Sequence, residues 1–175
     1  MNKGINCATG DVIGILNSDD LFNSENIIRN VVKSFNDNNV DALFGDLVYV
    51  NRDKISDIKR NWCSSSNKVG SFVRGWHPPH PTLFIKRIIY KSYGKFDLNY
   101  PLAADFELML RFLHIYKISY VYLPEIIIRM RLGGETNKSF KNILKQNLEI
   151  LKVFKKYHIR VSPLIYIYQR LFPKV

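Results

Sequence analysis

The chain has 175 residues, of which 46% are hydrophobic and 23% are charged, a composition that fits one folded domain and excludes a low-complexity protein. Its formal net charge of +11 suits a nucleic acid, an anionic membrane surface or a phosphate-bearing substrate, and charge alone does not choose among these partners. Only two cysteines occur, and their spacing is not that of a metal site, so a disulfide framework is excluded and a reducing cytoplasm is the default location. No apolar run approaches the roughly 20 residues that span a bilayer.

The first strong pattern is an apolar run that ends in two adjacent carboxylates. Residues 12–16 have the length and branched composition of a buried strand, so Asp19 and Asp20 should follow its carboxyl end, where open α/β sheets bind ligands. Two adjacent acids on a turn can offer oxygen ligands to a hard divalent cation that neutralises the phosphates of a nucleotide. The same pair can merely open a turn and cap the next helix, so corroboration must come from elsewhere in the chain.

An alternation of helices and strands is predicted after this pair. Asn23 or Ser24 can cap a helix whose apolar residues recur at helical spacing from Ile27 to Phe35 and which ends near 37–39. A strand over 40–50, a turn over 51–54 and a returning strand over 55–62 are predicted next, followed by a polar loop over 63–68. The stretch over 72–81 is rich in proline, which excludes a regular helix there. The remaining predicted elements are a strand over 82–85, helices over 87–93 and 103–116, strands over 118–123 and 125–131, a helix over 139–157 and a short helix opened by Ser162 and Pro163.

Two histidines lie in the proline-rich stretch. Prolines restrict the backbone around His77 and His80, so either imidazole can be held ready to bind a metal, a phosphate or an acceptor hydroxyl. A loop histidine can equally be exposed or make a packing hydrogen bond, and the sequence leaves both alternatives open.

The predicted helix over 103–116 begins with a carboxylate in its first turn. Asp105 can cap this helix and interact with its positive end, or it can act as a general base that takes a proton from an acceptor hydroxyl. Glu107 and Arg111 are four residues apart and are expected to pair across one helix face, contributing about 0.3 kcal/mol.

Two arginines precede a glycine pair. Arg129 and Arg131 share one side of a predicted strand just before Gly133 and Gly134. The planar guanidinium pairs two phosphate oxygens and glycine lets a phosphate approach the backbone, so this segment suits a diphosphate. A solvated edge strand and turn is the alternative.

Seven segments carry a family resemblance when they are taken in order. They read MNKGI over 1–5, ATGD over 8–11, NSDDLF over 17–22, PHPTLF over 79–84, YGKFD over 93–97, AADFELMLR over 103–111 and MRLGG over 130–134. This set resembles a bacterial family 2 glycosyltransferase with the GT-A fold. The resemblance covers residues 1–145 as the C-terminal two-thirds of such a domain and implies an α/β fold, with a Rossmann-like mixed sheet flanked by helices. Residues 146–175 would form a C-terminal helical extension.

The resemblance also implies roles for individual residues. Asp20 would be the ligand of Mg²⁺ or Mn²⁺ at the family's DXD-type site, and Asp19 would lie close to the nucleotide ribose or the metal. His80 would flank the donor diphosphate and the acceptor pocket, Arg131 would contact phosphate, and Asp105 would be the catalytic base. The implied reaction transfers a sugar with inversion from a nucleotide-diphosphate sugar to a hydroxyl of a saccharide or lipid-linked acceptor, in cell-surface polysaccharide or lipid-linked oligosaccharide synthesis. His77 has no place in the motif.

The family pattern begins before the first residue of this chain. The strand and the acidic motif that hold the nucleotide base and ribose in the family are not present, so an N-terminally truncated fold, an incomplete donor pocket and an open edge at residues 12–16 are expected. A noncatalytic acceptor-binding or assembly subunit derived from such an enzyme is therefore the alternative function. A nucleic-acid binder is disfavoured, because net charge and aromatic content are not accompanied by a recognition motif.

Basic and aromatic residues mix near the C-terminus. The segments over 154–160 and 164–170 suit an anionic interface, which predicts peripheral contact with the inner face of the cytoplasmic membrane. The alternative is an ordinary C-terminal helix that packs on the sheet.

Overall fold

The computed structural model describes residues 1–65, 71–133, 140–164 and 166–167. Its chain divides into two compact units, each built from three separate chain segments. Unit 1 consists of Met1–Ser66, Pro78–Lys95 and Ile118–Gly133, and unit 2 consists of Asn67–His77, Phe96–Lys117 and Gly134–Val175. The chain therefore passes back and forth between the two units.

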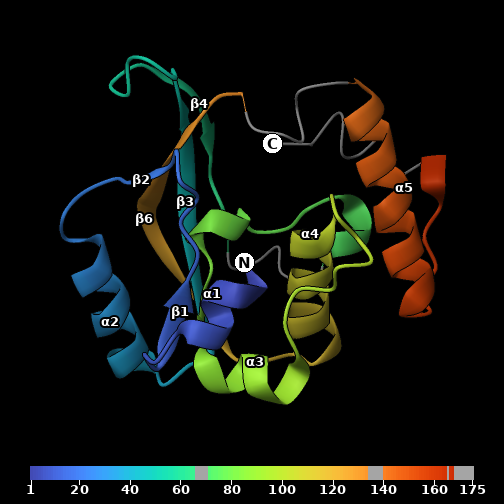
Figure 1. Cartoon of the computed structure of the whole chain (residues 1–175), viewed down its shortest axis with the longest axis horizontal. Helices are drawn as coiled ribbons and strands as arrows, with labels where there is room; N and C mark the ends of the chain where they lie inside the picture. The colour runs from blue at the N-terminus through green and yellow to red at the C-terminus, as the bar shows by residue number, and fades with distance from the viewer. Residues whose placement is uncertain (66–70, 134–139, 165, 168–175) are drawn as a thin grey trace. The chain divides into compact units, whose positions relative to one another are not determined.

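Unit 1 is a mixed sheet flanked by helices, as expected for a GT-A-like fold (Figure 1). The sheet order is β1-β5-β3-β6-β2, and β4 pairs with β3 outside this path; β3 and β6 are parallel, and the other described pairs are antiparallel. The strands are β1 Val12–Gly14, β2 Leu21–Phe22, β3 Ala42–Val50, β4 Ile58–Trp62, β5 Phe84–Lys86 and β6 Tyr120–Arg131, and the helices are α1 Asn2–Cys7, α2 Ile27–Asn38 and α3 Arg87–Tyr93. The predicted hairpin of β3 and β4 is confirmed.

The core of unit 1 forms between the sheet and α2. β3 is buried along almost its whole length, as its nearly continuous apolar sequence requires, and α2 packs on β3 and β6 with one apolar stripe. The predicted helix is thus confirmed, but its predicted cap is wrong. The N-cap residue is Asn26, with no side-chain cap bond, and the helix ends at Asn39 in the left-handed region with φ of 45°.

The two strands predicted over 118–131 form one strand, β6, with an irregular middle. Phe44 of β3 pairs with Tyr122 and Asp46 pairs with Ile126, so β6 uses more residues than β3 over the same length. Pro124 lies within this bulge, because proline cannot donate a ladder hydrogen bond. The break predicted between the strands over 118–123 and 125–131 is therefore local, and pairing resumes on both sides.

The segment before β5 is helical rather than extended at its start. A 3₁₀ turn, η3 His80–Thr82, precedes β5, so the strand predicted from residue 82 begins two residues later. The buried hydroxyl of Thr82 lies 3.0 Å from the carbonyl oxygen of Gly45 and 2.8 Å from that of Pro79. These contacts fix the turn to β3 and hold His80 at the sheet.

Unit 2 is helical. The helix predicted over 103–116 is α4 Ala104–Met109, which continues as a π-helical turn, η4 Leu110–Ile115, and the helix predicted over 139–157 is α5 Phe140–Lys156; residue 139 lies outside the described residues. Residues 163–164 and 166–167 are helical, in line with the predicted final helix. The boundary predicted between residues 145 and 146 falls within α5 and stays a prediction.

Aromatic rings form the core of unit 2. Phe106 of α4 meets Phe72 edge-on, with ring centroids 5.8 Å apart, and Phe154 of α5 at 5.4 Å. Phe154 in turn meets Tyr166 at 5.3 Å. Edge-to-face packing at these separations is the favoured arrangement of aromatic pairs, so one chain of rings joins α4, α5 and the segment after α5.

Candidate functional site

The acid pair lies in the turn that follows β1, as predicted, and this turn leads into β2. The Asp20 side chain is buried, with 4% of the residue exposed, whereas Asp19 is half-buried. The Asn17 side-chain amide donates to one Asp20 carboxylate oxygen at 2.8 Å, and the backbone N–H of Arg131 donates to the other at 3.3 Å. Asp20 therefore ties its own turn to the end of β6.

Arg131 lies directly against this turn. Its Nη1 donates to the backbone carbonyl of Asp19 at 3.3 Å, while its Nε–H is buried and has no hydrogen-bond partner among the described residues. An unsatisfied buried donor costs free energy unless a ligand or water accepts from it. Arg129 is engaged elsewhere, because its Nε donates to the Asn23 side chain at 2.8 Å.

His80 completes the group of predicted residues in unit 1. It is half-buried on η3, and its interaction with Asp20 lowers the pKa of that carboxyl. Burial of Asp20 has the larger effect and raises this pKa above its ordinary value, against the hydrogen bonds from Asn17 and Arg131. The structure thus brings Asp19, Asp20, His80 and Arg131 together, with both signs of charge at one place.

The raised pKa predicts a pH-dependent cost of the Asp20 carboxylate. The Asp20 carboxyl has a pKa of 3.8 in the unfolded chain and a higher pKa in the native state, so between these two values the native state binds more protons. The contribution of Asp20 to the free energy of unfolding therefore falls as the pH rises through this range and is constant above it. Asp20→Asn should therefore raise the free energy of unfolding of the ligand-free protein at neutral pH, and the gain should shrink toward pH 3.8. Urea unfolding across this range measures it, with the exposed Asp37→Asn as control; an equal gain in both variants contradicts the prediction.

An aromatic stack on the hairpin was not predicted from the sequence. The rings of Tyr49 on β3 and Trp62 on β4 stack with centroids 6.3 Å apart, and the Arg60 guanidinium lies 5.4 Å from the Tyr49 ring centre. Burial raises the pKa of the Tyr49 phenol, and the charge of Asp20 adds to this, so the stack lies within electrostatic range of the acid pair. Cross-strand pairing could have identified these residues, had the hairpin register been known.

Asp105 lies in unit 2, on the first turn of α4. Its carboxylate is half-buried and accepts the backbone N–H of Phe106 at 2.8 Å. The N-cap residue of α4 is Ala103, so the alternative in which Asp105 is the cap residue is wrong. His77 also lies in unit 2, where its ring meets the Phe106 ring edge-on at 5.7 Å.

Glu107 and Arg111 form the predicted pair, but they are not on an exposed helix face. The Glu107 side chain is fully buried, and its carboxylate lies 3.0 Å from Arg111 Nη2 and 2.9 Å from Lys156 Nζ; it also accepts a short hydrogen bond from the Tyr157 hydroxyl. Burial and the bond to Glu107 raise the pKa of Tyr157 to about 12. Burial alone would lower the pKa of Lys156, but hydrogen bonds to Asp97 and Glu107 outweigh it and raise that pKa. This network binds α5 to α4, the helix that carries Asp105.

The acid pair fits a divalent cation only where a bound substrate and water supply the other oxygen ligands. Within the described parts of the chain, no three His, Cys, Asp or Glu side chains gather as a complete metal cage. Mg²⁺ is commonly held by one or two carboxylates, with water and substrate phosphates as its other ligands. Asp19 and Asp20 can supply those carboxylates, and Arg131 and His80 can supply the donors that phosphate oxygens need.

These features define an α/β protein in which a group of side chains of both charge signs lies at the end of a strand. The model of the family described as "Glycosyl transferase family 2" matches residues 1–95, which is more than half of the chain. The chain belongs to glycosyl transferase family 2, and its class of activity is therefore glycosyl transfer. No curated protein matches the chain. None of the described helices is long and apolar enough to pass through a bilayer.

Proposed function

We propose that this protein transfers a sugar, with inversion, from a nucleotide-diphosphate sugar to a hydroxyl of a saccharide or lipid-linked acceptor in bacterial cell-surface polysaccharide or lipid-linked oligosaccharide synthesis. The observation that carries the proposal is the contact of Arg131 with the turn of Asp19 and Asp20, beside His80. A metal-bound diphosphate needs carboxylates for its cation and cationic donors for its oxygens, and this turn offers both.

In this mechanism each residue has a distinct task at the donor. Arg131 donates to the diphosphate through its unsatisfied Nε–H, and His80 lies beside the phosphates. Asp20 would hold the divalent cation, Mg²⁺ or Mn²⁺, and Asp19 would lie close to the nucleotide ribose or the cation. When bound, the cation neutralises the negative charge that develops on the leaving phosphate.

Asp105 is the proposed general base. Its carboxylate takes the proton of the acceptor hydroxyl while that oxygen attacks the anomeric carbon from the face opposite the leaving group. The bond to the new oxygen forms as the bond to the diphosphate breaks, so the configuration inverts and the nucleoside diphosphate departs with the bonding electrons. The base needs no covalent bond to the sugar.

The aromatic stack provides a flat surface near this donor site. The stacked rings of Tyr49 and Trp62, with Arg60 over them, can pack against the face of a base or a sugar ring. We include this surface in the proposal as a binding surface for a ring of the substrate, adjacent to the acid pair.

Calorimetry tests the donor site directly. We expect UDP, GDP or dTDP to bind the 175-residue chain in the presence of Mn²⁺, and Asp20→Ala to weaken that binding by at least about 10-fold, because truncation of a ligand carboxylate removes a metal contact. Asp37→Ala, which removes an exposed carboxylate from α2, is the matched control and should bind as the parent chain does.

The outcomes separate the proposal from its alternative. Equal binding by the Asp20 and Asp37 variants would contradict the assignment of the acid pair to the nucleotide. A folded chain that binds no nucleoside diphosphate but does bind a saccharide acceptor would overturn the proposed transfer and favour an acceptor-binding subunit.

A further inference from the structure

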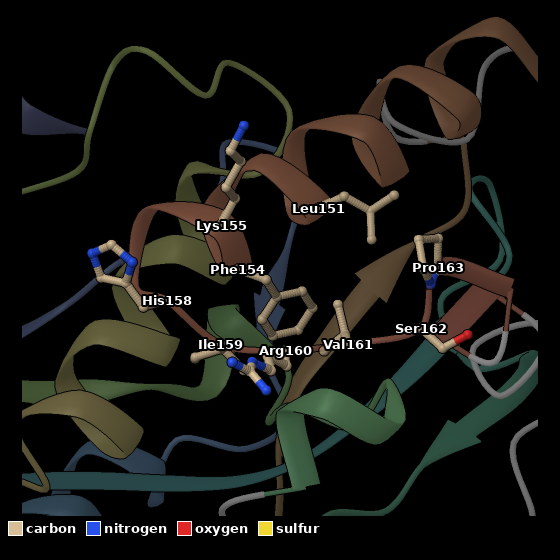
Figure 2. A pocket seen from close by; sticks show the side chains of 9 residues that line it. All are labelled: Leu151, Phe154, Lys155, His158, Ile159, Arg160, Val161, Ser162 and Pro163. Atoms are coloured by element: carbon tan, nitrogen blue, oxygen red, sulfur yellow. The ribbon is translucent and has the colours of Figure 1, made fainter.

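A hollow of about 660 Å³ lies in unit 2, between the last turns of α5 and the segment that follows the helix (Figure 2). One part of its wall is apolar: Leu151 and Phe154 come from α5, and Val161 and Pro163 from the returning segment. Figure 2 shows these side chains directed toward the space between the helix and the segment. The donor site of the proposed function uses none of them.

The other part of the wall is basic. Lys155, His158 and Arg160 line the hollow at the end of α5, and all three are exposed. Figure 2 shows Lys155 and His158 on the side away from Val161 and Pro163. None of the described residues that line the hollow is acidic. The polar end of the hollow therefore favours an anion, because no carboxylate among these lining residues would repel it.

An apolar stripe leads along α5 to this hollow. Leu144 and Leu148 are 50% and 52% exposed, although leucines on a helix that packs on a core are usually turned inward. Their spacing of four residues, followed by Leu151 three residues later, places them on one face of the helix. Lys145 and Lys152, both exposed, lie along one side of the stripe.

α5 packs on the core of unit 2 with residues other than those of this stripe. Ile150, Val153 and Phe154 are each at most 1% exposed and belong to the core of unit 2. Leu164, on the segment beyond the hollow, is 82% exposed. The helix therefore has two apolar faces, and the outer one is bordered by lysines.

We propose that the stripe and the hollow together dock on an anionic phospholipid bilayer. Leu144 and Leu148 enter the interface, the lipid phosphates lie against Lys155 and Arg160, and the apolar wall of the hollow receives the adjoining glycerol and upper acyl chain. An amphiphile with a phosphate next to a hydrocarbon chain matches both ends of the hollow, and the net charge of +11 attracts the whole protein to a negative surface. Of the sequence segments that predicted membrane contact, residues 165 and 168–170 lie outside the described residues, so the inference rests on α5 and residues 158–164.

Vesicle flotation tests this inference. The full chain should float with vesicles of phosphatidylcholine and phosphatidylglycerol in equal amounts at low salt, remain at the bottom with phosphatidylcholine alone, and dissociate as salt is raised, because salt screens the phosphates. Failure to float with the anionic vesicles, or equal flotation with the neutral ones, would overturn it.

Two pairs of variants separate a defined docking face from general basic charge. Lys155→Gln with Arg160→Gln should lower the partition coefficient about 30-fold, whereas Lys33→Gln with Lys91→Gln, which removes the same charge from exposed positions of unit 1, should lower it much less. Leu144→Ser with Leu148→Ser should lower the partition coefficient about 10-fold. Ile88→Ser with Leu98→Ser, at two exposed positions, is the control and should leave the partition coefficient unchanged. Equal losses in a variant and its control would overturn the proposed face; unchanged thermal unfolding verifies that each variant is folded.

Discussion

Asp105→Asn is expected to lower the rate of sugar transfer by about 1,000-fold, the middle of the range for loss of a general base. The amide cannot accept the proton of the acceptor hydroxyl, yet it keeps the size of the side chain and an oxygen for the Phe106 N–H. Donor binding should stay unchanged, because the proposed donor residues lie in unit 1. The measurement is single-turnover release of nucleoside diphosphate, with donor binding followed by calorimetry on the same samples.

Two comparisons make this result specific to the base. Asp37→Asn removes an exposed carboxylate from α2 and should transfer sugar at the parent rate. Asp105→Glu keeps the carboxylate and should retain more activity than Asp105→Asn. If the amide variant transfers sugar as fast as the parent, then Asp105 is not the base and the proposed mechanism fails.

Glu107→Gln is expected to destabilise the fold by about 3–5 kcal/mol, because removal of one partner leaves a buried charge uncompensated. Arg111 has a side chain only 9% exposed and loses its carboxylate, and the Tyr157 hydroxyl loses a charged acceptor. The free energy of unfolding in urea at neutral pH measures the effect. Glu25→Gln, at an exposed position, should change it by less than about 0.5 kcal/mol.

A graded series checks the cause of this loss. Lys156→Met should cost much less than Glu107→Gln, because it removes a partner that is 38% exposed and weakened by solvent, and Arg111 still compensates the buried Glu107 carboxylate. Similar losses in Glu107→Gln and Glu25→Gln would show that the carboxylate is not stabilising α4. A shifted urea dependence, rather than a shifted midpoint, would instead point to a changed unfolded state.

The sequence predicted the elements whose signals are local. The apolar stripe of α2 and the glycine that ends α3 specify helices by spacing and backbone freedom alone, and both helices are observed. β2 was missed, because its two residues carry no periodic pattern. It forms only where Leu21 and Phe22 meet Arg129 and Ile128 of β6, which is a contact between distant parts of the chain.

The candidate site divides in the same way. The turn of Asp19 and Asp20 could be predicted from the apolar run before it, but its contact with Arg131 depends on pairing across more than a hundred residues. Likewise, helical spacing predicted the bond between Glu107 and Arg111. The burial of this pair and the additional bond from Lys156 to Glu107 come from the packing of α5. Sequence spacing therefore predicts partners that are neighbours along one element, whereas partners from distant elements become visible only in the folded structure.

The interleaved units also constrain the order in which the nascent chain can fold. The strands described in unit 1 have all been synthesised once residue 133 has emerged, whereas unit 2 lacks α5 at that stage. Until then, Phe106 lacks its contact with Phe154, and Glu107 lacks Lys156 and Tyr157. Exposed aromatic surface in such an intermediate promotes aggregation. Translation speed over residues 134–156, and the chaperones present while they emerge, should therefore control the yield of folded protein.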